Sequence, residues 1–126
     1  MKRAIKSLLL VTLITFIGTN SASAHAKLLS ATPSVGSTIN SWPAKLSIQF
    51  NEPILKINGA VVDWAYVKNS RGQRVDNGNP KVSGAFLTVG LKSSAKSGKY
   101  FVQYRAVSED GHPVSGTFTF TYLPPK

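Results

Sequence analysis

The feature that most constrains the fold is a two-residue apolar period that recurs along the chain after residue 24. In 45–50, Leu46, Ile48 and Phe50 fall on one face and polar side chains fall on the other. This alternation is typical of a half-buried strand. The expected strands are 26–31, 45–50, 61–68, 73–75, 85–91, 100–108 and 114–123. About seven short strands separated by turns predict an all-β fold, a Greek-key β-sandwich or small barrel.

The first 24 residues have the three parts of a secretory leader. A positive head precedes an uncharged apolar run over 8–17, and an A-x-A cleavage signal ends at Ala24. The apolar run is shorter than the ~20 residues that cross a bilayer, so we expect cleavage rather than a membrane anchor. The prediction is a signal peptide over 1–24 and one domain over 25–126, exported most simply to a bacterial periplasm.

Composition and charge exclude several classes of function. Without cysteine, the chain has no disulfide, thiol nucleophile or thiolate metal site. Three of the fifteen Lys and Arg residues lie in the leader, which leaves twelve against five acids and a formal charge of +7. These cations occur one at a time along the sequence. We therefore expect no nucleic-acid partner, and only weak attraction to anionic headgroups or acidic partners.

Asp110 and His112 form a candidate metal-binding pair in the stretch SEDGHP. Because they are two residues apart, an extended chain points both side chains the same way. On spacing alone, an ordinary polar turn in which the carboxylate accepts a hydrogen bond from the imidazole is the more frequent outcome. The position of the other histidine, His25, favours the metal-binding interpretation over the polar turn.

His25 becomes the first residue if cleavage follows Ala24. Its α-amine and its Nδ1 can then close a six-membered chelate ring on one metal ion, because an amine with a pKa of ~7.7–8.0 loses its proton readily to a metal. The alternative is a frayed end whose histidine is there by chance. Two imidazoles, an amine and a carboxylate suit Cu(II) better than zinc or nickel. Because the mature chain has no methionine or cysteine, a Cu(I) site is not expected.

Three stretches resemble the CopC/YobA family of periplasmic copper-resistance proteins. They are HAKLLSATPSVGSTI at 25–39, LSIQFNEPI at 46–54 and GKYFVQYRAVSEDGHPVSGTFTF at 98–120, in the order and spacing of the family. The resemblance implies an immunoglobulin-like Greek-key fold over 25–126. It also implies one type-2-like Cu(II) ion, carried or buffered in the periplasm for copper homeostasis and resistance.

The resemblance also implies a set of ligands. The N-terminal histidine and the D-G-H motif of the family match His25, Asp110 and His112. A glutamate of the family matches Glu52, although Asn51 replaces the serine before it, and Glu52 is either a ligand or a supporting acid. The family's methionine-rich loop is missing, which implies a single Cu(II) site. A CopD-like inner-membrane protein is the implied partner, and we expect a monomer.

Two other functions stay open from the sequence. An N-terminal histidine, a second histidine and copper also describe the brace of copper-dependent polysaccharide oxygenases, which are generally larger and have a flat aromatic face. The aromatic residues here, including Trp42 and Trp64, are expected in or at the core. The other alternative is an interaction sandwich without metal. We expect no enzyme, because neither a G-x-S-x-G elbow nor a Gly-rich phosphate loop occurs in the sequence.

Overall fold

The structure is a computed structural model that describes residues 25–58, 62–93 and 95–126. The predicted leader, with its cut after Ala24, lies outside these residues. The described part of the chain contains no helix, and hence none long and apolar enough to span a membrane. Its strands are β1 (Leu28–Thr32), β2 (Thr38–Ile39), β3 (Lys45–Phe50), β4 (Trp64–Lys68), β5 (Lys81–Ser83), β6 (Phe86–Gly90), β7 (Gly98–Val107) and β8 (Pro113–Tyr122).

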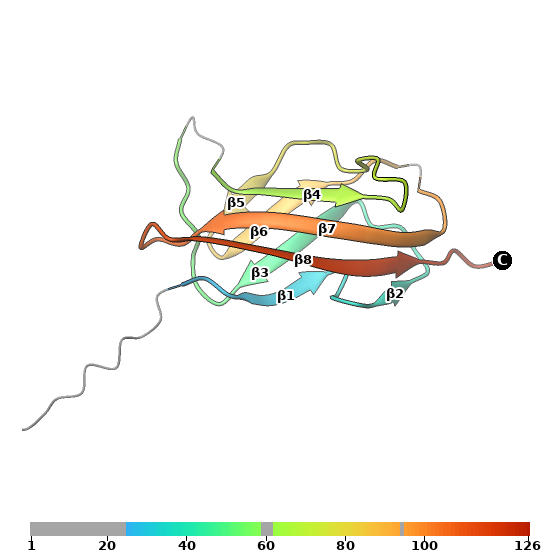
Figure 1. Ribbon diagram of the computed structural model, residues 1–126, viewed down its shortest axis with the longest axis horizontal. Helices are drawn as coiled ribbons and strands as arrows, with labels where there is room; N and C mark the ends of the chain where they lie inside the picture. Colours follow the sequence, from blue (N-terminus) through green and yellow to red (C-terminus); the bar gives the residue numbers. More distant parts are fainter. Residues whose placement is uncertain (1–24, 59–61, 94) are drawn as a thin grey trace, which may run out of the picture.

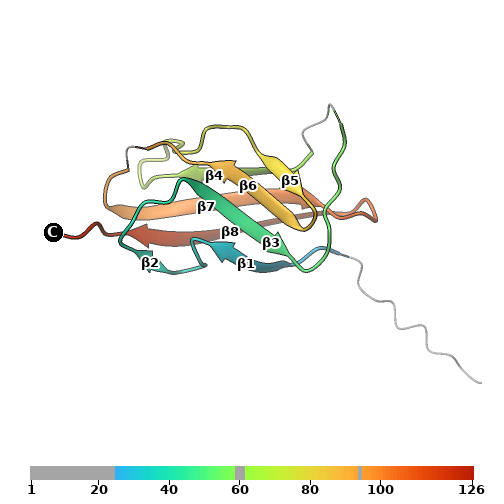
Figure 2. The same ribbon diagram turned by 180° about the vertical axis from the view of Figure 1, so that it is seen from behind.

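The strands form two four-stranded sheets that pack face to face (Figure 1). The sheet orders are β1-β3-β6-β5 and β2-β8-β7-β4, and Figure 2 shows the first of them from its outer side. The described pairs are antiparallel, except that β2 runs parallel to β8. The ten-residue strands β7 and β8 are consecutive and pair along their whole length. The arrangement confirms the predicted immunoglobulin-like β-sandwich.

The strand positions follow the predicted pattern, with two additions. The predicted and observed bounds of β3 agree, and β1, β6, β7 and β8 begin and end within two residues of expectation. The strand expected over 61–68 is shorter, because β4 begins only at Trp64, and position 61 lies outside the described residues. Residues 73–75 pair back onto β4 only through the Lys68–Arg74 bridge and a hydrogen bond from Val75 N–H to Val67 O. β2 and β5 were not predicted, because two or three residues are too few to display a period.

The inward-facing side chains of the two sheets build one apolar core. Its buried members include Leu46, Ile48, Phe50, Ala65, Val67, Leu87, Val89, Tyr100, Val102, Tyr104, Ala106, Phe118 and Phe120. Trp42 packs against this core, as expected, and its Nε1–H donates to Lys92 O at 2.8 Å. Trp64 differs from expectation, because the small Ala65 takes the inward position on β4. The Trp64 ring instead stacks on Tyr66 at the outer face, with centroids 4.5 Å apart.

Asp76 is a buried carboxylate that organises the chain after β4. Its oxygens accept hydrogen bonds from the backbone N–H groups of Val67 and Gly78 and from the Arg74 guanidinium. Burial alone would raise the pKa of Asp76, but the bonds from Arg74 and the two amides outweigh burial and hold the pKa below 3.8. A lowered pKa in the folded state means that the ionised carboxylate stabilises the fold above about pH 4, and that this contribution is lost as the pH falls.

Replacing Asp76 with asparagine is expected to lower the free energy of unfolding by about 2 kcal/mol at neutral pH, because charge-assisted hydrogen bonds become neutral ones. The difference between the two proteins should shrink below about pH 4, where the wild-type carboxylate becomes protonated. Urea unfolding of both proteins from about pH 7 to about pH 3 measures this. A difference that does not change with pH would contradict the ionised state of Asp76.

Candidate metal centre

The candidate metal centre lies at the end of the sandwich where β7 turns into β8 and where the described chain begins (Figure 1). His25, Asp110 and His112 each offer one donor atom there, and the three atoms lie within 4.8 Å of one another. Asp110 Oδ2 is 3.1 Å from His112 Nδ1 and 3.7 Å from His25 Nδ1. The two imidazole rings meet edge to face, with centroids 4.7 Å apart. The fold therefore joins the first described residue to the β7–β8 loop.

Local hydrogen bonds hold the β7–β8 loop in shape. Ser108 N–H donates to His112 O at 3.0 Å, and Gly111 N–H donates to Ser108 O at 2.9 Å. Gly111 has a φ of +87°, a left-handed conformation that glycine adopts without steric cost. Asp110 Oδ1 accepts hydrogen bonds from His112 N–H and from the Ser108 hydroxyl. The other oxygen, Oδ2, is the one that faces both histidines.

The same hydrogen bonds keep Asp110 ionised. The Ser108 hydroxyl, and after it the His112 N–H, lower the pKa of Asp110 from 3.8 to about 2. The carboxylate is therefore available to a cation without first losing a proton at neutral pH. Ser108 is fully buried and was not among the predicted site residues. The sequence signal for its contact with Asp110 is a serine two residues before an aspartate, because these residues at this spacing favour side-chain hydrogen bonds within a turn.

His25 is positioned by the residues that follow it. Ala26 is only 2% exposed and belongs to the core. Lys27 N–H donates to Asn51 Oδ1 at 2.7 Å, and Asn51 N–H donates to Lys27 O at 2.9 Å. This two-point contact fixes the start of β1 to the loop after β3 and places the His25 ring beside the β7–β8 loop. Asn51, where the resemblance expects serine, thus helps to place His25.

Glu52 lies in the loop after β3 and does not belong to the three-residue donor group. Its loop is tied to the end of β7, because Leu55 N–H donates to Val107 O at 2.7 Å and Ile54 pairs with Ser108. Glu52 Oε1 is buried and has no hydrogen-bond partner among the described residues. Three of the four predicted site residues therefore converge, and the fourth, Glu52, lies outside the group that they form.

The distances from Asp110 Oδ2 to the two imidazoles suit donors that share a single metal ion. An ion with bonds of about 2 Å separates adjacent donors by about 3 Å and opposite donors by about 4 Å. The distances of 3.1 and 3.7 Å from Asp110 Oδ2 to the two imidazoles fall within this range. The side chains of His25 and His112 are 50% and 64% exposed, so an ion held there would be open to solvent.

A β-sandwich with two histidines and a carboxylate gathered at one end defines a protein with a candidate mononuclear metal centre. Residues 28–123 match the CopC domain, and the chain belongs to this family. Copper resistance protein C of Pseudomonas syringae pv. tomato is 32% identical over 107 residues, which cover 79% of this chain and 81% of that protein. Copper transport protein CutJ of Bacillus subtilis is 36% identical over 103 residues, which are 78% of this chain but only 18% of CutJ.

Solved structures show the same fold. The crystal structure of CopC from Methylosinus trichosporium OB3b superposes with a TM-score of 0.71 at 25% identity, covering 81% of this chain and 97% of that chain. PcoC, a methionine-rich copper resistance protein from Escherichia coli, superposes with a TM-score of 0.63 at 25% identity, covering 79% and 99%. These matches confirm the family that the sequence motifs indicated.

Proposed function

We propose that this chain is a periplasmic Cu(II)-binding protein that carries or buffers one copper ion in copper homeostasis and resistance. The convergence of His25, Asp110 and His112 at one end of the sandwich carries the proposal. Two imidazoles and an ionised carboxylate suit Cu(II), which heads the affinity series of the divalent metals. Relatives named copper resistance protein C and copper transport protein CutJ support copper as the cargo.

In this proposal, removal of the leader supplies a further donor. A chain cut after Ala24 begins with a free α-amine on His25, which can chelate one ion together with the Nδ1 of the same residue. His25 Nδ1 faces Asp110 Oδ2 at 3.7 Å, and this orientation supports Nδ1 as the coordinating nitrogen. Glu52 then acts as a supporting acid beside the ligands, since the other three residues gather without it. Export and copper binding are coupled, because the uncut chain lacks the amine.

The exposure of the two histidines supports a carrier rather than an enzyme. An ion between half-exposed side chains can pass to another protein without opening of the sandwich. In CutJ the matched stretch is about a fifth of a longer copper transport protein, which supports transfer to a transporter. A CopD-like inner-membrane protein is the partner that we propose.

One added residue tests the proposed function. Placing a single alanine before His25 is expected to weaken Cu(II) binding about tenfold or more, because the six-membered ring between amine and Nδ1 is lost. The starting material is the chain that begins at His25, and competition against a Cu(II) chelator measures the affinity. Electron paramagnetic resonance of the copper form reports the change of nitrogen donors.

The matched control carries its extra alanine after Lys126, at the other terminus of the chain. Its Cu(II) affinity should equal that of the unextended protein. Equal Cu(II) affinities for both extended chains would show that the α-amine is not a ligand. Failure of the chain that begins at His25 to bind one equivalent of Cu(II) would overturn the proposed function as a whole.

A further inference from the structure

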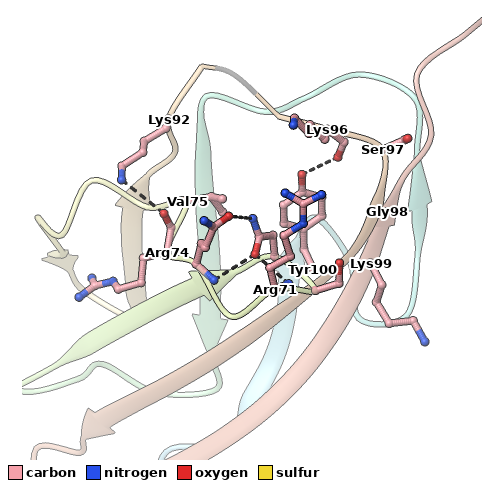
Figure 3. A pocket seen from close by; sticks show the side chains of 12 residues that line it. Arg71, Arg74, Val75, Lys92, Lys96, Ser97, Gly98, Lys99 and Tyr100 are labelled. Atoms are coloured by element: carbon pink, nitrogen blue, oxygen red, sulfur yellow. Dashed lines mark hydrogen bonds between the residues drawn. The ribbon is translucent and has the colours of Figure 1, made fainter.

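A pocket of about 510 Å³ lies at the end of the sandwich opposite the metal centre. It is formed by the turn over 69–75 that follows β4 and by the segment that leads into β7 (Figure 3). Its lining includes five cationic side chains, namely Arg71, Arg74, Lys92, Lys96 and Lys99. Five of the twelve Lys and Arg residues after the leader therefore line one pocket, although the side chains of Arg74 and Lys99 point away from it in Figure 3. Cations that occur one at a time along the sequence thus line the same pocket in the fold.

Little negative charge balances these cations. No carboxylate is among the described residues that line the pocket. Asp76, the nearest acid in the sequence, has no exposed side-chain surface and is already bonded to Arg74 and two backbone amides. The other four acids lie toward the metal centre: Glu52, Asp63, which accepts from Val107 N–H, Glu109 and Asp110. Four cations of the pocket thus have no carboxylate partner in the described structure, which makes this end strongly positive.

Both walls of the pocket are held in shape by hydrogen bonds. Asn69 Oδ1 accepts from the N–H groups of Arg71 and Gln73, each at 3.0 Å, so the backbone that carries Arg71 is fixed. On the opposite wall, the Tyr100 hydroxyl donates to Lys96 O at 2.5 Å. Lys92 Nζ donates to Arg74 O at 3.3 Å and joins the two walls (Figure 3). Such preorganisation lowers the entropy lost when a ligand binds.

We infer that this pocket binds a phosphate-type oxyanion. The planar guanidinium of Arg71 matches two phosphate oxygens at once, and the ammonium group of Lys96 adds a point charge. The same chemistry is found in a free phosphate and in the headgroup of an anionic phospholipid. β7 separates the pocket from the metal centre by about 30 Å, since ten strand residues rise about 3.3 Å each. Anion binding therefore leaves the histidines of the metal centre free.

Two charge-matched double variants test this inference. The first variant, Arg71→Gln with Lys96→Gln, removes two charges from the pocket. The second, Lys45→Gln with Lys81→Gln, removes two exposed charges from the sheet β1-β3-β6-β5, outside the pocket. Calorimetric titration with inorganic phosphate at low ionic strength measures binding of the free anion. Sedimentation with phosphatidylglycerol vesicles, against phosphatidylcholine vesicles, measures binding of the headgroup. The pocket variant should bind the anion about tenfold or more weakly, and the control should stay within about twofold.

The outcomes separate the two sources of the anion. Phosphate binding that depends on the pocket, without a preference for anionic vesicles, identifies a free anion as the ligand. Sedimentation with phosphatidylglycerol that depends on the pocket identifies the headgroup. Equal losses in the two double variants would show an effect of net charge alone and overturn the inference, as would a lack of binding to both probes. Cu(II) affinity, titrated separately, should be unchanged in both variants and verifies their folding.

Discussion

A His112→Ala chain that begins at His25 is expected to bind Cu(II) at least about 100-fold more weakly than the unmodified chain. His112 supplies one of the two imidazoles, and its Nδ1 lies 3.1 Å from Asp110 Oδ2. Changes to residues that only support a ligand typically cost ~10–100-fold in metal affinity, so removal of a ligand should exceed that range. Chelator competition measures the affinity, and the loss of one nitrogen coupling in the paramagnetic resonance spectrum identifies the missing donor.

Glu109→Gln is the matched control for this substitution. Glu109 is exposed in the same loop, next to Asp110, and does not belong to the donor group. Its replacement should change the Cu(II) affinity by no more than about threefold, because exposed charges contribute little. The His112 side chain is 64% exposed, so both variants should unfold at nearly the same urea concentration as the wild type. An unchanged Cu(II) affinity in His112→Ala would exclude this histidine from the site.

The part of the site that could be predicted from sequence is the local part. Asp110 and His112 are two residues apart, so their proximity needs only an extended or turning chain. The supporting contacts could not be predicted in this way, because they join distant segments. The bond from Lys27 N–H to Asn51 Oδ1 spans 24 positions and exists because β1 and β3 are neighbours in one sheet. Placing His25 therefore required the tertiary fold as well as the cleavage signal.

The pocket lined by cations, between the turn over 69–75 and the start of β7, could not be predicted from the sequence either. Its cations occur between positions 71 and 99, with no two adjacent in the sequence. They line one pocket because β4 and β7 are antiparallel neighbours, with Lys68 opposite Phe101, so the turn after β4 lies beside the segment before β7. A clustered charge can thus arise from a strand pairing even where the sequence shows single cations. Strand pairing is a tertiary property that the two-residue period does not reveal.

The two-residue period also leaves open which face of a strand is buried. On β4 the alternation divides Trp64 and Tyr66 from Ala65 and Val67. Hydrophobicity alone would place the larger aromatic pair inside. The structure buries Ala65 and Val67 instead, and the aromatic pair stacks outside, where the Arg74 guanidinium lies 3.9 Å from the Tyr66 centroid. The choice follows from the space between the sheets, which the rings of Phe50, Tyr100, Tyr104 and Phe120 already occupy.

Phe120→Ala is expected to lower the free energy of unfolding by about 3–5 kcal/mol. Phe120 on β8 is 1% exposed and stacks on Tyr100, with centroids 5.5 Å apart and ring planes at 13°. The Trp42 ring lies 6.1 Å from it, so truncation leaves a cavity between the two sheets. Domains of this size have a total stability of about 5–15 kcal/mol, and this chain has no disulfide to compensate the loss. Urea unfolding followed by tryptophan fluorescence measures the difference.

Phe101→Ala is the matched control, because the same side chain is removed from the opposite face of the same sheet. Phe101 lies on β7 opposite Thr119, next to the position of Phe120, and is 45% exposed. Its truncation should lower the free energy of unfolding by less than about 1 kcal/mol, because little apolar surface leaves a packed environment. Equal losses for the two variants would contradict the assignment of inner and outer faces. A shift of one residue in the pairing of β7 with β8 would place Phe101 and Phe120 on the same face, so the comparison tests the register itself.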